Sequence, residues 1–401
     1  MAGLVSLTEA QELVLARVRA LESERVPVER AAGRVLAEAA RAVADLPPFR
    51  SSAMDGYAVR SGDLSPLPTT LAVRGEARAG RPYPGTVSTG EAVRISTGGA
   101  VPTGADAVVP VELTEGGDGA VVVRSAVPAD ANVRGIGGDV RSGDTVLEPG
   151  TVLAPAAVGA LAAAGVAEVR CAKRPRVAIL VTGGELRSPG AELAPGEIYE
   201  SNGLLLAAAL QSAGAVPAQL GVVEDERDEI VRASERALLA FDVLLTTGGA
   251  SVGPHDLVRE AQRGLRVEEV FWGVAVKPGK PVAFGVRRDH LVFNLPGNPV
   301  SVLVAFELLV RPALNALVGL PRPLPRLLSA RLAAPVRRNA ARHEFVRARA
   351  LGEGEELLLE PLRGQESHMI VRAASADALL SVEPGEGELA AGELVRYLPL
   401  A

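Results

Sequence analysis

The spacing of apolar and polar positions predicts helices at the start of the chain. A helix is expected over 7–21, where Thr8 is the expected N-cap, Gln11 would complete a capping box, and Leu13, Leu15, Val18 and Leu21 give an apolar stripe. A second short helix is expected over 31–39. The proline pair at 47–48 ends this helical part, because proline disfavours helical backbone at its own position and at the residue before it.

The next part of the chain has the period of a β protein. From residue 57 to about 170, short valine-rich runs alternate with Gly/Pro turns at the spacing expected of a small barrel or sandwich. A helix over 154–164 interrupts this pattern, with Pro155 in its first turn. A proline-rich linker at 321–325 precedes a second region of short strands and turns, which again predicts a small β-barrel or sandwich.

Between these two β regions, strands alternate with helices. Several strands are continuous apolar runs, which is typical of strands covered on both faces. The alternation implies a mostly parallel, doubly wound α/β sheet over 176–320. Strands are expected at 177–181, 215–223, 243–247, 282–286 and 291–293, and helices at 204–213, 229–239, 257–262 and 300–317.

Glycine-rich loops fall at the carboxyl ends of these strands. Ligands bind at that edge of a doubly wound sheet, so one crevice would collect the loops at 182–184, 247–249 and 294–299. Glycine lets the backbone approach a ligand closely, and a helix that starts after such a loop offers free N–H groups to an anion. The chain has neither the Gly-Lys-Ser/Thr of a Walker loop nor the three-glycine dinucleotide fingerprint. The pattern therefore predicts a phosphate or anion site of another kind.

The distribution of lysine indicates the same region. Lys and Arg together number 42, but only Lys173, Lys277 and Lys280 are lysine. Lys is a compact point charge and Arg a planar fork, so a site that needs the first does not easily accept the second. Two of the three lysines lie in one tetrapeptide beside a predicted strand. The alternative to a binding site is chance or a solvated turn.

Composition and charge exclude several classes of function. The chain of 401 residues is 48% hydrophobic and 22% charged, as expected of a globular protein of about two to four domains. A net charge of −6 argues against a general nucleic-acid surface. No apolar run predicts a transmembrane helix and no signal-peptide pattern is present, so we expect a cytoplasmic protein without membrane contact. The single cysteine, Cys171, cannot form an internal disulfide, and no Ser-His-Asp or Cys-His arrangement is evident.

Three carboxylates lie at predicted strand ends of the α/β sheet, namely Glu185, Asp225 and Asp256. Hard oxygen ligands in this place suit Mg²⁺, which keeps several waters and bridges phosphate oxygens. Helix N-capping is the alternative role, above all for Asp256.

Asp55, Thr97 and Asp139 lie in polar, glycine-rich loops of the first β region. Turn formation is their simplest role, since Asp-Gly is common in turns, and spacing alone does not place them near the sheet. The residues by themselves therefore predict an anion- and nucleotide-handling α/β domain embedded among β modules.

Eight motifs are spread over the chain in a fixed order. They are Pro47-Pro48-Phe49 with Ser52-Ala53-Met54-Asp55-Gly56-Tyr57-Ala58, Thr97-Gly98, Gly138-Asp139, Thr182-Gly183-Gly184-Glu185-Leu186, Ser201-Asn202, Gly248-Gly249-Ala250-Ser251-Val252-Gly253, Lys277-Pro278-Gly279-Lys280-Pro281 and Leu295-Pro296-Gly297-Asn298-Pro299. In this order the sequence resembles the molybdopterin molybdenumtransferases over essentially its whole length. That family comprises the bacterial MoeA proteins and their animal counterpart, the gephyrin E domain.

The resemblance implies a multidomain α/β plus β fold with four domains. They would be an elongated, discontinuous N-terminal dimerisation domain of helical and mixed structure (1–45 plus 141–172), an inserted β domain (46–140), a molybdopterin-binding α/β domain (173–320) and a small C-terminal β-barrel (321–401). Family members form homodimers, and the active cleft lies between the α/β domain of one subunit and the inserted β domain of the other. This arrangement would bring Asp55, Thr97 and Asp139 into the site.

The implied reaction joins molybdate to adenylylated molybdopterin, giving molybdenum cofactor and AMP, with a divalent cation such as Mg²⁺. The dithiolene sulfurs belong to the pterin, in agreement with the single cysteine. Carried over by motif, the catalytic residues are Asp55, Thr97, Asp139, Glu185, Asp225, Asp256, Lys277 and Lys280, and the metal is handled by Glu185, Asp225 and Asp256. The substrate-binding residues are Thr182, Gly183, Gly184, Ser201, Asn202, Gly248, Gly249, Ser251, Gly253, Pro278, Gly279, Pro296, Gly297, Asn298, Pro299, Ser301, Arg342 and Ser367.

One departure from the family is Gly184, where Asp usually precedes the glutamate, and it leaves open whether Glu185 alone serves that position.

Three other functions stay open. A molybdopterin adenylyltransferase shares the α/β domain but normally lacks the domain of Asp55 and the barrel. A tungstate-specific insertase is not distinguished by sequence, because the two oxyanions have nearly the same size and charge. A gephyrin-like scaffold would need a peptide groove. Transient contact with other molybdenum cofactor enzymes is consistent with the family.

Overall fold

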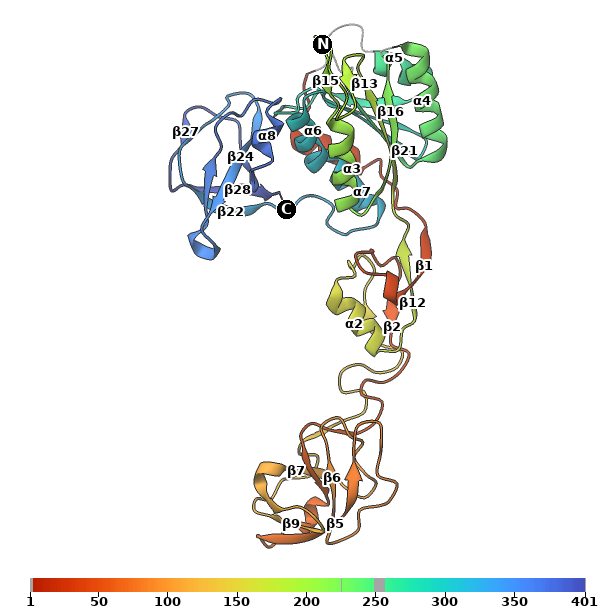
Figure 1. Cartoon of the computed structure of the whole chain (residues 1–401), viewed down its shortest axis with the longest axis vertical. Helices are drawn as coiled ribbons and strands as arrows, with labels where there is room; N and C mark the ends of the chain where they lie inside the picture. Colours follow the sequence, from red (N-terminus) through yellow and green to blue (C-terminus); the bar gives the residue numbers. More distant parts are fainter. Residues whose placement is uncertain (1–2, 225, 249–256, 401) are drawn as a thin grey trace. The chain divides into compact units, whose positions relative to one another are not determined.

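The protein is described by a computed structural model over residues 3–224, 226–248 and 257–400. It divides into two compact units (Figure 1). The first contains Met1–Glu24 and Ala172–Ala401, and the second contains Arg25–Cys171. The finer division into four domains stays a prediction.

A six-stranded sheet is the centre of the first unit, in the order β16-β13-β17-β21-β20-β18. The first four strands of this order are parallel, and β20 runs antiparallel to β21. The predicted α/β sheet is therefore confirmed as a mixed one, and β18 is a strand that the sequence pattern did not indicate. The bounds are β13 Arg176–Thr182, β16 Val216–Val223, β17 Val243–Thr247, β18 Glu268–Trp272, β20 Ala283–Arg287 and β21 His290–Leu295.

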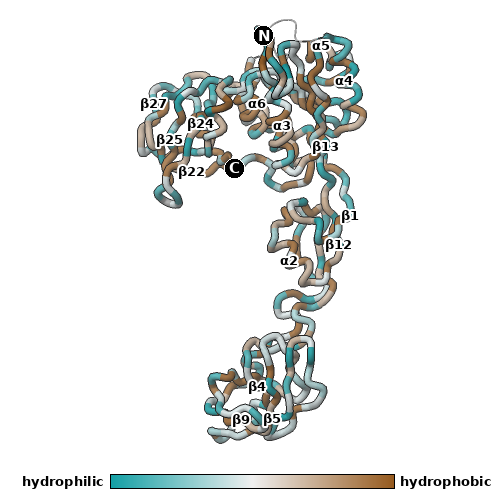
Figure 2. Tube along the Cα trace, viewed as in Figure 1, coloured by the Kyte–Doolittle hydropathy of each residue, from teal (hydrophilic) through white to brown (hydrophobic). Residues whose placement is uncertain are grey.

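Helices cover both faces of this sheet. Alternate residues of β13 enter different cores, since Val177 and Ile179 pack with α1 and α3, whereas Ala178 and Leu180 pack with α4. Figure 2 shows long brown segments along β13 and α3, as expected of elements with buried apolar faces. The bounds are α1 Leu7–Leu15, α3 Asn202–Ser212, α4 Arg227–Ala240, α5 Leu257–Gly264, α6 Pro299–Ala305, the π-helical η4 Phe306–Val310, and α7 Arg311–Leu317.

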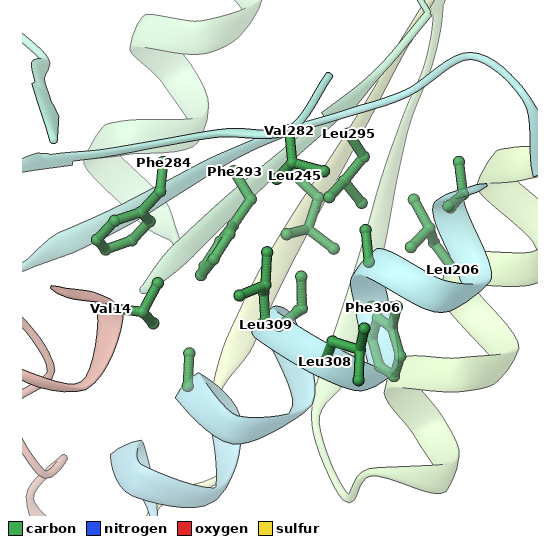
Figure 3. Close-up of a cluster of buried hydrophobic side chains, with 14 of the residues drawn as sticks. Val14, Leu206, Leu245, Val282, Phe284, Phe293, Leu295, Phe306, Leu308 and Leu309 are labelled. Carbon is green, nitrogen blue, oxygen red and sulfur yellow. The ribbon is translucent and has the colours of Figure 1, made fainter. Parts of the chain in front are cut away.

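The core of the α/β sheet is built around two phenylalanines on neighbouring strands. The rings of Phe284 and Phe293 lie with their centroids 4.8 Å apart, and both are fully buried. Figure 3 shows them on the same side of the sheet as Leu309 from η4 and Val14 from α1. The sheet, the N-terminal helix α1 and the long helix formed by α6, η4 and α7 therefore pack together in one core.

A proline explains the link between α1 and the long helix. Pro312 has no N–H to donate to the carbonyl of Leu308, four residues earlier. That carbonyl accepts from Nε2 of Gln11 instead, at 3.0 Å. Among the described residues, Pro299–Leu317 alone is long and apolar enough to cross a membrane, but its most apolar window is 78% buried. It is a core helix.

Three details of the N-terminal helices were predicted wrongly. Helix α1 ends at Leu15 rather than at residue 21, and its N-cap is Ser6, whose Oγ accepts from the N–H of Glu9 at 3.1 Å. The predicted helix over 31–39 does not form. Val35 and Leu36 make strand bridges with distant residues there, so tertiary pairing overrides local helix propensity.

The end of the first unit is a small β-barrel, as predicted. Strands β24, β25, β22, β28 and β26 are neighbours in that order, and a further pairing of β26 with β24 closes the ring. Strand β19, Val276–Lys277, adds to β24 from the α/β part of the chain. The other bounds are β14 Leu186–Arg187, β15 Ile198–Tyr199, β22 Leu328–Leu332, β23 Val336–Arg337, β24 His343–Leu351, η5 Gly354–Glu356, β25 Leu358–Pro361, α8 Ile370–Ala373, β26 Ala378–Val382, β27 Glu388–Leu389 and β28 Leu394–Pro399.

The second unit is mainly β structure, again as predicted. A six-stranded sheet, in the order β7-β4-β6-β5-β9-β8, accompanies three two-stranded ones, β1-β12, β2-β11 and β3-β10, and the helix α2. The bounds are β1 Ser23–Pro27, η1 Val28–Arg30, β2 Ala40–Arg41, β3 Ser51–Ser52, β4 Gly56–Val59, η2 Ser61–Asp63, β5 Thr69–Ala77, β6 Glu91–Ile95, β7 Ala107–Pro110, η3 Val111–Leu113, β8 Thr114–Gly116, β9 Ala120–Val123, β10 Val133–Arg134, β11 Thr145–Leu147, α2 Pro155–Ala163 and β12 Glu168–Ala172.

The phenylalanine pair gives a direct test of this core. Phe293→Ala should lower the free energy of unfolding by about 3–5 kcal/mol, because it leaves a cavity against Phe284 and the long helix. Leu239→Ala is the control, since Leu239 is 76% exposed on α4 and its truncation should change stability by less than about 0.5 kcal/mol. Urea unfolding measures both. Equal losses in the two variants would contradict the described core.

Candidate functional site

A cleft of about 820 Å³ lies between the carboxyl edge of the α/β sheet and the barrel. Its volume falls in the range of small-molecule sites, roughly 300–1,000 Å³. Chain segments that are distant in sequence form its walls. They contribute Glu185, Ile198, Lys277, Pro278, Gly279, Lys280, Pro281, Pro296, Gly297, Asn298, Ser301, Arg342, Gln365, Glu366, Ser367 and His368.

The two lysines reach this edge because β20 runs antiparallel to β21. The start of β20 therefore lies beside the end of β21, with Ala283 opposite Asn294. Lys277 and Lys280 precede β20 and both line the cleft. Lys277 forms an ion pair with Glu344 of the barrel, at 2.9 Å between Nζ and Oε1.

The barrel contributes to the cleft through a loop that is tied to the sheet. The N–H of Val300 donates to the carbonyl of Ser367 at 3.1 Å, and Nδ2 of Asn298 donates to Oγ of Ser367 at 2.9 Å. Arg342 approaches from the start of β24 and also lines the cleft. Within the described parts of the chain, no carboxylate pairs with Arg342 or Lys280, so their charges face the cleft.

Close backbone approach explains the glycine at the end of β17. A Cβ on Gly248, where φ is +88°, would lie 1.9 Å from the carbonyl oxygen of Thr182. Asn202 supports the same edge, since its Nδ2 donates to Oγ1 of Thr247 at 3.0 Å and to the carbonyl of Gly297 at 2.7 Å. The predicted binding residues that belong to this edge without lining the cleft are Thr182, Gly183, Gly184, Ser201, Asn202, Gly248 and Pro299.

Glu185 is the one predicted metal residue that the structure describes. The residue is exposed, lines the cleft, and its side chain has no hydrogen bond or ion pair with the described residues. A free carboxylate fits Mg²⁺, which one or two carboxylates hold together with waters and substrate phosphates. No cluster of three His, Cys, Asp or Glu side chains occurs in the described ranges.

Several predicted residues fall outside the described ranges. They are Asp225, Gly249, Ser251, Gly253 and Asp256.

The predicted residues of the second unit are described there by themselves. Oδ1 of Asp55 accepts from both the backbone N–H and the hydroxyl of Thr97, at 2.7 and 3.1 Å. The antiparallel pairing of β4 with β6 thus brings these two residues together. Within the described residues, Asp139 is exposed and forms no hydrogen bond or ion pair with Asp55 or Thr97, while its N–H donates to the carbonyl of Leu46 at 2.9 Å.

Arg347 is a residue whose importance sequence reasoning missed. It is 1% exposed inside the barrel, and burial lowers the pKa of its guanidinium without discharging it at neutral pH. The fork donates to the carbonyls of Gly364, Glu366 and Met369 at 2.7, 3.2 and 3.0 Å. One buried cation therefore fixes the loop that carries Ser367. No local pattern distinguishes it from the many other arginines.

Three family models together match most of the chain. The model of the MoeA N-terminal region (domain I and II) matches residues 5–165, that of a probable molybdopterin-binding domain matches 178–316, and that of the MoeA C-terminal region (domain IV) matches 329–400. The chain belongs to the MoeA family of molybdopterin molybdenumtransferases. The predicted family, fold class and enzyme class are therefore confirmed. So is the predicted role in molybdenum cofactor biosynthesis.

Full-length relatives support membership in the MoeA family. Molybdopterin molybdenumtransferase 2 of Mycobacterium tuberculosis is 38% identical over 396 residues, which cover 96% of this chain and 97% of that protein. The molybdopterin molybdenumtransferase of Haemophilus influenzae is 34% identical over 382 residues, covering 94% of each. The crystal structure of the molybdopterin biosynthesis MoeA protein from Pyrococcus horikoshii OT3 matches with a TM-score of 0.87 at 30% identity, covering 99% of this chain and all of that one (100%).

Replacing the buried arginine should loosen the cleft loop. In Arg347→Met, three backbone carbonyls lose a charged donor, each worth about 1.5–3 kcal/mol, so the loop over 362–369 should exchange its amide hydrogens at least about tenfold faster. Hydrogen exchange read by mass spectrometry measures this. Arg349→Met is the matched control, because Arg349 is exposed on the same strand. Equal exchange in the two variants would show that Arg347 does not fix the loop.

Proposed function

We propose that this enzyme inserts molybdate into adenylylated molybdopterin, forming molybdenum cofactor and releasing AMP. The observation that supports the proposal most is the convergence of Lys277, Lys280, Arg342 and Ser301 on one cleft at the carboxyl edge of the sheet. A tetrahedral oxyanion needs cationic and hydroxyl donors around it, and these side chains supply both. The cleft is also large enough for the end of a pterin nucleotide.

Charge neutralisation is the physical basis of the proposed step. Molybdate and the phosphoanhydride of the adenylylated pterin are both anions and repel each other. The two lysines place fixed positive charge where the anions meet, which stabilises the charge of the transition state without a proton transfer. Lys280, which has no carboxylate partner among the described residues, carries its full charge into the cleft.

A divalent cation would add to this neutralisation. Glu185 would hold Mg²⁺ from the sheet side, together with Asp225 and Asp256, and the ion would polarise phosphate oxygens. The free carboxylate of Glu185 supports this assignment. Tungstate would meet the same groups, so the cleft by itself favours an oxyanion class rather than one metal.

We also propose a homodimer whose clefts are completed by the second unit of the partner, with the cytoplasm as its compartment. Support comes from the outer strand β16, which pairs with β13 alone. Val216 and Val222 on β16 are exposed, as is Leu204 of α3 beside Val222. Unpaired strand edges with apolar side chains favour association. Asp55, Thr97 and Asp139 would enter the cleft from the partner.

Removing either cleft lysine should abolish insertion. Lys277→Ala and Lys280→Ala should each lower the rate of molybdate-dependent AMP release at least about 100-fold, as expected when a preorganised charge donor is lost. The protein should stay folded. Lys173→Ala is the control, since this lysine pairs with Glu22 at 2.7 Å and does not line the cleft. Wild-type rates in a folded Lys277→Ala protein would rule out the proposed role.

A mixed-subunit experiment tests whether two chains share a cleft. Asp55→Asn and Lys277→Ala should each be inactive. Unfolding and refolding them together should restore roughly a quarter of the wild-type activity, because half of the random dimers then carry one intact cleft of two. AMP release is again the readout. If the mixture stays inactive while each variant refolds as a dimer, Asp55 and Lys277 do not complete each other's site across subunits.

A further inference from the structure

The Lys277–Glu344 ion pair joins a cleft residue to the barrel. Strand β19 pairs in parallel with β24, with Lys277 opposite Glu344, and the N–H of His343 donates to the carbonyl of Ala275 at 3.0 Å. The side chain of Lys277 is 43% exposed and lines the cleft, whereas that of Glu344 is 12% exposed. A largely buried carboxylate on the barrel side therefore pairs with a lysine whose side chain is partly exposed to the cleft.

Glu344 depends on this lysine for its charge balance. Among the described residues, Lys277 is the only cation that pairs with it, and its partner across the neighbouring strand β26 is the apolar Val382. A buried carboxylate that loses its partner is costly. Its negative charge also repels any anion that Lys277 binds on the cleft side. An anion and Glu344 thus compete for one ammonium group.

We propose that Glu344 is a positioning residue that competes with the oxyanion for Lys277 and so weakens oxyanion binding. This inference rests on the proposed oxyanion site. In the free protein, Glu344 neutralises Lys277 and fixes its direction. When the oxyanion binds, the ammonium group is shared between the two negative groups. The affinity of the cleft for the oxyanion is therefore lower than it would be without Glu344, so the oxyanion is not retained as a tight dead-end complex.

Molybdate binding to Glu344→Gln is the direct test. Glutamine keeps the size of the side chain and an oxygen acceptor for Lys277, but removes the charge. Equilibrium dialysis of the full-length protein against molybdate should show binding at least about fivefold tighter than in the wild type. The gain should vanish when Lys277→Ala is added, because the effect acts through that lysine.

A second ion pair of the same unit with a largely buried carboxylate is the matched control. Glu307 receives two hydrogen bonds from Arg311, at 2.6 and 2.8 Å, and neither residue lines the cleft. Glu307→Gln removes one negative charge and weakens a buried pair, so it reproduces the structural cost without the competition. Its molybdate affinity should stay within about twofold of the wild type.

The scarcity of lysine allows a measurement without any change at position 344. Protein labelled with ¹³C-lysine has three lysine signals, from Lys173, Lys277 and Lys280. Lys→Arg variants assign them. In the wild type, molybdate should move the Lys277 signal and leave the Lys173 signal unchanged. A Lys277 signal that does not respond to bound molybdate would show that Glu344 serves only as a clamp between barrel and sheet.

The outcomes separate the two claims. If the wild type binds molybdate and Glu344→Gln binds it equally or more weakly, the competition is overturned while the oxyanion site stands. If neither protein binds molybdate, the proposed oxyanion site fails and the competition fails with it. Tighter binding in Glu344→Gln, absent in the Lys277→Ala background and in Glu307→Gln, supports the inference.

Discussion

The short parallel pairing of β19 with β24 is the contact on which the cleft depends. Backbone hydrogen bonds of this pairing do not rely on particular side chains, so they fix the position of the lysine segment against the barrel. A second backbone bond, from Val300 to Ser367, fixes the loop on the other side. The α/β part and the barrel thereby present their charges to one space, and they also share packing, since Phe345, Leu379 and Leu398 of the barrel belong to the main core of the α/β sheet.

The electrostatics of the cleft differ from those of the whole chain. The protein carries a net charge of −6, yet the cleft collects Lys277, Lys280 and Arg342. A local cluster in an acidic protein attracts small anions without making the surface a nucleic-acid binder. Two largely buried charges lie next to the cleft: Arg347 bonds to the loop that carries Ser367, and Glu344 pairs with Lys277. Under the proposed function, exposed charge serves binding and buried charge fixes position.

Strands buried on both faces were predictable from sequence, and contacts between distant segments were not. The apolar run of β17 was placed at its observed bounds, since both of its faces are covered. The lysine loop was found because lysine is rare in this chain. The stretch over 31–39 was misread, since Val35 pairs with Val152, more than a hundred residues away. The role of Arg347 was not predicted for the same reason, because its carbonyl partners belong to another loop.

Some site assignments needed the resemblance to a family. No spacing rule connects Asp55 with Lys277, because they lie in different units. The structure explains part of the loop of Asp55 locally, through its two bonds from Thr97. Under the proposed function, a second chain supplies Asp55 to the cleft, and the mixed-subunit experiment tests this.

Reconstitution of the reaction tests the central claim most directly. Purified wild-type protein would receive adenylylated molybdopterin and Mg²⁺, with molybdate, with tungstate or with neither, and AMP release would be followed. The account predicts release that depends on an oxyanion, and the better of the two oxyanions identifies the metal. AMP release at the same rate without an oxyanion, or tight binding of the pterin nucleotide without any release, would contradict it.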